Sequence, residues 1–208
     1  MLNLGEAELL GAIVGDGFIY TKHKKYVIGL TGNPKTDSDY FLYLKKLIVS
    51  SWNKTPALFF RSKGVRILFS SKETVLKLFS VCDFAFGEGK CERARIPQEV
   101  INDKKLCSRF VRGLFDTDGS VFSANKPGAP NYPSIEFTTA SKELAFQVKD
   151  FLQNSGFKVA KIWSCKSKLS KRIVYKVPLN GKDNLKMWLE RIGFSNPYKF
   201  NKAISLSG

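Results

Sequence analysis

Histidine is almost missing from this chain of 208 residues, because His23 is the only one. A zinc site with several histidine ligands, a nuclease of the HNH type and a histidine-based catalytic triad each need histidine in a defined context. The single histidine therefore excludes most of these chemistries. His23 lies in the basic run Lys22 to Lys25, which we predict to be the solvated tip of a hairpin rather than a catalytic site.

Paired cysteines and long apolar runs are missing too. No CxxC pair occurs, which argues against a zinc ribbon and leaves the four cysteines as thiols of a reducing compartment: Cys82, Cys91, Cys107 and Cys165. No segment approaches the roughly 20 apolar residues that span a bilayer. Residues Met1 to Glu6 show no basic region before an apolar run, so we expect no signal peptide. We expect an intracellular protein, in prokaryotic cytoplasm in preference to an organelle.

Acidic residues are few. Asp and Glu total 18 against 34 Lys and Arg, which gives a net charge of +16. The excess positive charges repel one another unless a polyanion binds them, so nucleic acid is the first hypothesis for the partner. A membrane surface is disfavoured because the basic residues fall on predicted strands and not on an amphipathic helix. With 43% apolar residues, a packed globular fold is expected.

The chain repeats itself. Three segments of the first half have counterparts in the second, in the same order: Leu10–Gly17 with Arg112–Gly119, Ile28–Thr31 with Ile135–Thr138, and Ser71–Leu78 with Gly181–Trp188. The first pair shares a pattern of Gly, three residues, a small residue, and then Asp-Gly. Their common order indicates an internal duplication. We predict two domains, 1–98 and 99–208.

Each half has the same predicted order of elements, αββαββα, from apolar periodicity and turn residues. The first half is expected to hold helices near 4–15, 36–51 and 72–82, and strands near 18–21, 25–31, 57–61 and 65–70. The second is expected to hold helices near 103–117, 141–155 and 181–192, and strands near 120–124, 133–139, 158–164 and 172–178. Asn3 and Glu6 have capping-box spacing before the first helix. Antiparallel hairpins between helices indicate an α+β fold.

The two Asp-Gly motifs predict a shared site. Small residues four apart fall on one face of each motif helix and let two helices pack closely: Gly11 and Gly15, and Gly113 and Thr117. Asp16 and Asp118 come next, at the helix ends where the dipole disfavours an anion. Two nearby carboxylates repel, and a divalent cation such as Mg²⁺ between them removes that cost. The alternative is ordinary capping and turn chemistry at each motif, which two copies in a basic chain disfavour.

The motifs resemble the LAGLIDADG family of homing endonucleases. They are Leu9–Gly17 and Val111–Gly119, and the first departs from the family pattern at Ala12 and Val14, where Leu and Asp are usual. The similarity in organisation covers nearly the whole chain. Two copies are typical of monomeric, pseudo-symmetric members. Because no intein splicing residues frame Met1 to Gly208, the free-standing, intron-encoded type is the better match.

This resemblance implies a mechanism. The motif helices form the interface between halves, and each half presents a curved four-stranded antiparallel sheet to the DNA major groove. Asp16 and Asp118, with Gly15 and Thr117 beside them, hold Mg²⁺ or Mn²⁺ near two scissile phosphates, while Ca²⁺ can occupy the site without supporting cleavage. The implied partner is double-stranded DNA with a long, asymmetric target site, cut on both strands by a monomer.

The resemblance also implies auxiliary residues. Family members often place a lysine near each site after the last helix of the half, and Lys90 and Lys199 occupy that place here. They would position water or stabilise charge on the phosphate. The alternative is a phosphate contact or a solvated lysine. Relatives also carry a polar residue after the second strand, for which Asn33 serves in the first half, whereas Ala140 could not in the second.

The predicted strands and hairpins supply a basic surface that fits the major groove. The expected DNA-binding residues are Tyr20, Lys22, Lys24, Lys25, Arg61, Lys63, Arg66, Lys126, Lys158, Lys161, Ser164, Lys166, Lys168, Lys171, Arg172 and Lys176. Because most are lysines, the surface is expected to position DNA more than to read its sequence.

Three functions are consistent with these expectations. A site-specific double-strand DNA endonuclease comes first. An RNA maturase that helps an intron splice, with intron RNA as partner, is the second. A catalytically silent DNA-binding protein is the third. The paired acids Asp16 and Asp118 favour cleavage, because a pure binder has no need of two carboxylates at helix ends.

Overall fold

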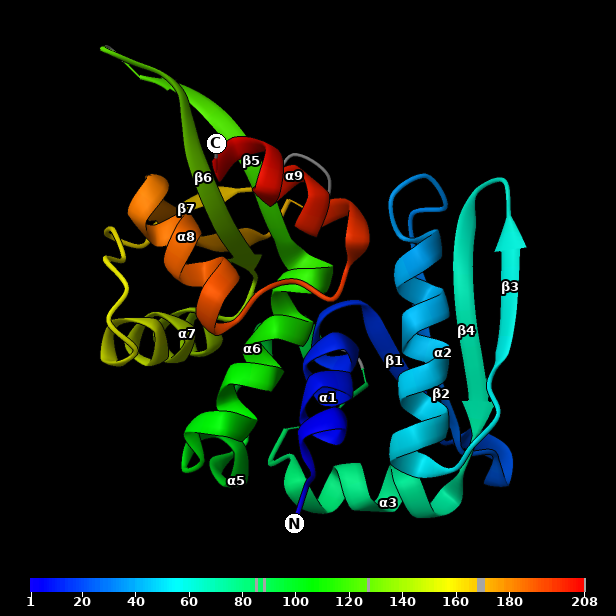
Figure 1. The fold of residues 1–208 in the computed structure, drawn as a ribbon. Helices are drawn as coiled ribbons and strands as arrows, with labels where there is room; N and C mark the ends of the chain where they lie inside the picture. The colour runs from blue at the N-terminus through cyan, green and yellow to red at the C-terminus, as the bar shows by residue number, and fades with distance from the viewer. Residues whose placement is uncertain (85, 88, 127, 168–170, 208) are drawn as a thin grey trace.

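Two helices side by side form the centre of the molecule (Figure 1): α1 (Leu4–Asp16) and α6 (Lys104–Asp118). The computed structural model describes residues 1–84, 86, 87, 89–126, 128–167 and 171–207. A four-stranded sheet continues from the end of each helix, one on either side of the pair. Along the described chain, no helix combines the length and apolar character needed to cross a bilayer.

The first sheet follows α1 directly. Its strands are β1 (Gly17–Tyr20), β2 (Val27–Gly32), β3 (Ala57–Arg61) and β4 (Gly64–Ser70), all antiparallel in the order β1-β2-β4-β3. The short 3₁₀ turn η1 (Lys22–Lys24) joins β1 to β2. Helices α2 (Ser38–Trp52) and α3 (Lys72–Val81) pack against one face of this sheet. Among the described residues, the other face carries exposed side chains such as Phe18, Phe59 and Arg66, and it is called the uncovered face below.

The second sheet repeats this arrangement after α6. Its strands are β5 (Gly119–Lys126), β6 (Ala129–Thr139), β7 (Trp163–Lys166) and β8 (Ile173–Asn180), in the order β5-β6-β8-β7. Helices α7 (Lys142–Asn154) and α8 (Lys182–Arg191) pack on one face. The predicted α+β class, with two four-stranded antiparallel sheets joined through the motif helices, is confirmed.

Three helices were not predicted: α4 (Lys90–Arg93), α5 (Gln98–Ile101) and α9 (Pro197–Ser207). The first follows the αββαββα unit of the first half, and the last extends that of the second half. The predicted boundary between residues 98 and 99 falls at the start of α5, and this division remains a prediction. "First half" and "second half" below mean the residues before and after it.

One strand prediction was wrong. The strand expected near 158–164 begins only at Trp163. The backbone of Lys158 instead bonds to the side-chain amide of Asn184, which accepts from Lys158 N at 3.0 Å and donates to Lys158 O at 2.8 Å. Val159 makes one isolated bridge to Leu179. A side-chain amide therefore replaces the sheet ladder at this point, which the alternating sequence could not reveal.

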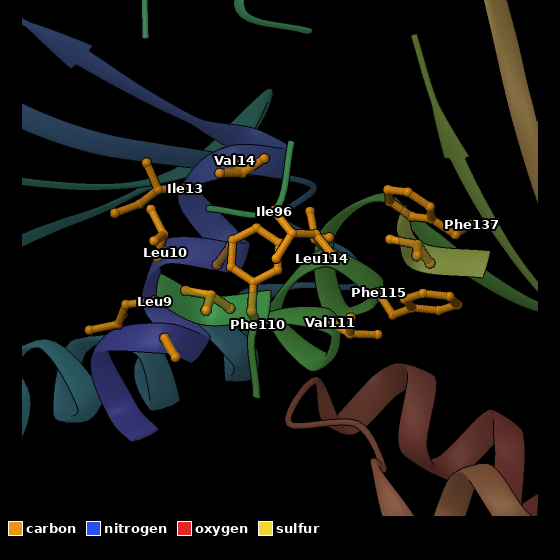
Figure 2. Packing of buried hydrophobic residues seen from close by; sticks show 14 of the residues in the cluster. Leu9, Leu10, Ile13, Val14, Ile96, Phe110, Val111, Leu114, Phe115 and Phe137 are labelled. Atoms are coloured by element: carbon orange, nitrogen blue, oxygen red, sulfur yellow. The ribbon is translucent and has the colours of Figure 1, made fainter. Parts of the chain in front are cut away.

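The core runs continuously from the helix pair into both halves (Figure 2). Leu10 and Ile13 of α1 and Phe110 and Leu114 of α6 are fully buried around the contact. The predicted capping box starts α1, because Asn3 and Glu6 each accept the other's backbone N–H at 2.9 Å. A buried apolar interface of this kind favours a fixed relative position of the two helix ends.

Candidate functional site

The two motif helices approach each other backbone to backbone. A Cβ atom added at Gly11 would overlap the carbonyl group of Phe110, and one added at Gly113 would overlap the carbonyl oxygen of Glu8. A methyl group at either position would force the helices apart. The small residues of the motifs therefore lie at the helix contact, and they bring the two C-terminal ends together.

Asp16 and Asp118 are the last residues of α1 and α6. A Cβ atom at Gly15 would overlap Oγ1 of Thr117 and stand 3.2 Å from Oδ2 of Asp118. The carboxylate of one helix thus lies against the last turn of the other. Each carboxylate also lies at the negative end of its own helix dipole.

The surroundings disfavour negative charge on both acids. Burial raises the pKa of Asp118 to about 7, and the nearby charge of Asp16 adds to this, while Lys90 and Lys199 act in the opposite direction. Burial is also the largest cause of the raised pKa of Asp16, although part of that side chain is exposed to solvent. Two carboxylates held in this way are stabilised by a cation placed between them.

A lysine binds the end of each motif helix. Lys90 Nζ donates to the carbonyl oxygens of Ile13 and Gly15 at 3.0 Å and of Gly17 at 2.6 Å. Gly15 O is one of the last carbonyls of α1, which have no helical partner, whereas Ile13 O also accepts from the N–H of Gly17, the first residue after the helix. An ammonium group is favourable there because the helix dipole is negative.

Lys199 does the same for α6. Its Nζ donates to the carbonyl oxygens of Phe115 and Thr117, both at 2.8 Å. Burial lowers the pKa of both lysines, and the nearby carboxylates offset part of that effect. The structure therefore brings Lys90 and Lys199 to equivalent places beside the two acids, and their catalytic role remains a prediction.

The donor atoms fit a hard divalent cation. Carboxylate oxygens of Asp16 and Asp118 are ligands that Mg²⁺ prefers, and main-chain oxygens of Gly15 and Thr117 lie beside them. Both carbonyls already accept from a lysine, and each retains a second lone pair. In the part of the chain that the structure describes, no cluster of three His, Cys, Asp or Glu side chains is suited to a metal. Two acids alone would then carry the ionic part of the binding.

The predicted auxiliary residue Asn33 lies in the turn before α2. Its Oδ1 accepts from Lys35 N at 2.9 Å, and its own N–H donates to Asp37 Oδ2 at 2.7 Å. Its side chain is thus engaged in local turn structure, and a catalytic role for Asn33 remains a prediction. A pocket of about 180 Å³ beside Asp118 is lined by Gly15 and Ala140, among others.

Comparisons with known proteins agree with this geometry. Residues 105–193 match the family described as LAGLIDADG-like domain. The replication factor C small subunit of Methanocaldococcus jannaschii is 26% identical over 200 residues, which cover 96% of this chain and 10% of that protein. The chain spans only 10% to 23% of the length of the curated relatives it matches.

Solved structures match over nearly the whole chain. I-DmoI in complex with DNA and Ca superposes with a TM-score of 0.62 at 16% identity, covering 97% of this chain and 96% of that one. I-WcaI, a homing endonuclease bound to its DNA recognition sequence, gives 0.61 at 16%, covering 99% and 86%. The chain has the fold of the LAGLIDADG homing endonucleases. Other I-DmoI complexes with DNA were solved with Mn or Mg.

The uncovered sheet faces of this LAGLIDADG-fold chain carry matching rows of side chains. The rows run across three paired strands: Thr31, Arg66 and Phe59 in the first half, and Thr138, Lys176 and Trp163 in the second. In each row a cation stands between a threonine and an aromatic residue. Lys176 is further engaged, because its Nζ bonds Glu136 at 2.6 Å and lies 4.8 Å from the centre of the Trp163 ring.

The other predicted DNA-binding residues of this LAGLIDADG-fold chain lie on strands, in turns and in the segment before β7, and their roles remain predictions. Tyr20 and Arg61 are exposed on strands of the first sheet. Turns carry Lys22, Lys24, Lys25, Lys63 and Lys171, and the exposed His23 lies among them. Lys158 and Lys161 precede β7 rather than lying on it.

Strand alternation divides the remaining predicted residues. Ser164 and Lys166 follow Trp163 at odd spacing, so they project to the opposite side of the edge strand β7. Arg172 bonds across the halves, donating to Cys91 Sγ at 2.7 Å and pairing with Glu92 at 3.3 Å. The prediction for Lys168 and that for the side chain of Lys126 lie outside the described residues.

Buried polar residues near the site were not singled out from the sequence. Asp116, Asn196 and Glu8 are almost completely buried, and Asp37 lies at the start of α2. The signal for Asp116 was present in the motif, since it stands where the family pattern has its first aspartate. The signal for Asn196 was its place directly before Pro197, where asparagine commonly caps a helix.

Proposed function

We propose that this chain is a site-specific double-strand DNA endonuclease. One observation carries the proposal: each of two tightly packed helices ends in an aspartate, Asp16 or Asp118, and a lysine binds the carbonyls of each helix end, Lys90 at α1 and Lys199 at α6. The arrangement is repeated once per half, as two strands of a duplex require. The homing endonuclease fold and the net charge of +16 support it.

The acids have the role of metal ligands. Asp16 and Asp118 would hold Mg²⁺ or Mn²⁺, with carbonyls of Gly15 and Thr117 close by, and Ca²⁺ would fill the same place without supporting cleavage. When bound, the divalent ion would supply activation of water and stabilisation of the leaving oxygen of a phosphodiester. The burial that raises the pKa of Asp118 to about 7 creates the demand for positive charge that such an ion meets.

The lysines have two roles. Lys90 and Lys199 fix the main chain at each helix end, and they keep positive charge within reach of a phosphate that approaches the acids. Asn33 is an auxiliary group of the first half. Burial lowers the pKa of Lys90 and of Lys199, and the neighbouring carboxylates offset part of that effect.

The uncovered sheet faces bind the DNA. Antiparallel ribbons fit the major groove, and their cations pair with phosphates. Because the two faces carry different side chains, the target is long and asymmetric. One chain supplies both halves, 1–98 and 99–208, so it acts as a monomer inside the cell.

Separate binding and cutting experiments test the proposal. Duplexes with a randomised centre are first selected for binding in Ca²⁺, and bound duplexes are then incubated in Mg²⁺ and their broken ends sequenced. We expect defined double-strand breaks with short 3′ overhangs. Asp16→Asn and Asp118→Asn should retain binding and lose cleavage. The matched control is Asp150→Asn, which changes an exposed aspartate of α7.

The outcomes separate the alternatives. Cleavage by both Asp16→Asn and Asp118→Asn would show that the assigned acids are not the metal ligands. Selective binding by the wild-type chain without cleavage in Mg²⁺ or Mn²⁺ would instead indicate a silent DNA-binding protein.

A further inference from the structure

The loop between α8 and α9 ends in a buried polar residue. Asn196, at its end, is 0% exposed. Its Oδ1 accepts from the backbone N–H groups of Tyr198 at 3.1 Å and Lys199 at 3.4 Å, so Asn196 caps the first turn of α9. Lys199 belongs to this capped turn. The direction in which its side chain leaves the backbone is therefore set by Asn196.

Asp116 of α6 also binds the loop between α8 and α9. Its carboxylate oxygens accept from the backbone N–H groups of Ser195 at 3.1 Å and Asn196 at 3.0 Å. Asp116 is 1% exposed and stands two residues before Asp118 on α6. These contacts form a closed ring that runs from Asp116 to Asn196, along α9 to Lys199, and back to α6.

The first half contributes to this ring. Asn196 Nδ2 donates to Asp37 Oδ1 at 3.1 Å, and Asp37 lies at the N-terminus of α2. Ser195 Oγ donates to Glu8 Oε1 of α1 at 2.5 Å. Glu8 also accepts from the hydroxyl group of Tyr43 at 2.7 Å. The loop that carries Lys199 is thus fixed to elements of both halves.

The matching place in the first half is built differently. Val14 stands two residues before Asp16, where Asp116 stands before Asp118. A valine side chain accepts no hydrogen bond, so it cannot hold a loop by its backbone N–H groups. Lys90 reaches the end of α1 without such an anchor on the motif helix.

We propose that Asp116 and Asn196 are positioning residues that hold Lys199 against the end of α6. The inference rests on the proposed function for its consequence, which is that their loss slows hydrolysis of one DNA strand only. Buried polar groups whose partners are all satisfied specify a single arrangement, and that is what a lysine beside a scissile phosphate requires. The second-half site thus depends on a ring of hydrogen bonds that the first-half site does not share.

Strand-resolved cleavage tests the consequence. Duplexes recovered from the selection above are labelled on either strand and digested with Asn196→Ala and with Asp116→Asn, which keeps the shape of the side chain. We expect one strand to be cut about ten- to a hundredfold more slowly, with accumulation of nicked duplex. It should be the strand that Lys199→Met protects. The control is Asn184→Ala, which removes an equally buried asparagine that bonds Lys158 O at 2.8 Å, away from the site.

A second measurement does not depend on cleavage. The ¹⁵Nζ signal of Lys199, assigned by its loss in Lys199→Met, should move toward the value of a solvated lysine in Asn196→Ala and Asp116→Asn. It should stay in place in Asn184→Ala. An unmoved signal in both variants, or equal slowing of both strands, would overturn the positioning role. A wild-type chain that cuts no DNA would refute the proposed function alone, and the Lys199 signal would still decide the positioning.

Discussion

The two motif helices end alike but are supported differently. Lys90 holds three carbonyls at the end of α1, whereas Lys199 holds two at the end of α6 and depends on the loop that Asp116 anchors. The position that matches Asp116 is Val14. The acids and lysines that we propose for the chemistry are repeated, whereas the residues that hold the lysines have diverged. In a duplicated site, the acids and lysines can therefore stay equivalent between the halves while the residues that support them differ.

The uncovered sheet faces diverge in the same way. In the first half, Gly29 lies between Phe18 and Leu68, and the Phe18 ring and the Leu68 side chain cover it. At the matching position of the second half stands Glu136, which pairs with Lys176. One face is apolar where the other is ionic. Unequal faces favour unequal half-sites in the DNA, in line with the proposed asymmetric target.

The largest expected effect on cleavage comes from replacing either Lys90 or Lys199. Lys90→Met and Lys199→Met should each slow cleavage of a different strand by about a hundred- to a thousandfold, the loss typical of a positioned charge at the reacting centre. Strand-labelled duplexes and the ratio of nicked to linear product measure it. Lys202→Met on α9 is the control, because Lys202 is exposed. If both variants protected the same strand, the assignment of one lysine to each half would be wrong.

The contact between α1 and α6 should be destabilised equally by an added methyl group on either helix. Gly11→Ala and Gly113→Ala each place a methyl group into backbone of the other helix, so each should lower the free energy of unfolding by about 1 to 3 kcal/mol. Urea unfolding measures the change. Gly87→Ala serves as the control, since a Cβ atom there meets nothing within 4 Å. An alanine tolerated at only one of the two positions would show that the helices are not packed symmetrically.

Much of the fold could be predicted because local patterns and the repeat agreed. The capping box at Asn3, the small residues at the helix contact and the ends of the motif helices at Asp16 and Asp118 are local signals. The strand near 158–164 was misplaced because a distant side chain, Asn184, takes the backbone bonds that a neighbouring strand would take. Propensity says nothing about a partner 26 residues away.

The site was predictable only in part. Lys90 and Lys199 were located by resemblance, and in the structure each ammonium group donates to a free carbonyl at a helix end. The ring through Asp116 and Asn196 was not predictable, because its contacts join residues about 80 positions apart. Burial of these polar groups becomes visible only when both halves are packed.

A smaller effect, on the pH dependence of stability, is expected to distinguish Asp118 from Asp16. The pKa of Asp118 is raised to about 7 from an ordinary value of 3.8, so the folded state binds a proton there more tightly than the unfolded state. Stability of the metal-free protein must then fall as the pH rises from about 4 to 7. Asp118→Asn removes this loss and should stabilise the protein at pH 8. Because the Asp118 side chain is partly exposed to solvent, the expected gain is only about 1 to 2 kcal/mol.

The pH dependence supplies the check. Thermal unfolding in EDTA at pH 4.5 and pH 8 should show the gain from Asp118→Asn growing with pH. Asp16→Asn should gain less, because Asp16 is more exposed to solvent. Equal gains at both pH values would contradict the raised pKa of Asp118.

The smallest expected effect compares the cations of the two matching rows. Arg66 lies beside Thr31 and Phe59, whereas Lys176 is already neutralised in part by Glu136 at 2.6 Å. Each phosphate contact that is lost reduces the slope of log binding constant against log salt by about 1. Arg66→Ala should therefore lower the slope by about 1, and Lys176→Ala by less. Glu136→Gln should raise it, because it frees Lys176 for a phosphate. Binding titrations in Ca²⁺ at several salt concentrations measure all three, and equal slopes for Arg66→Ala and Lys176→Ala would show that the ion pair opens when DNA binds.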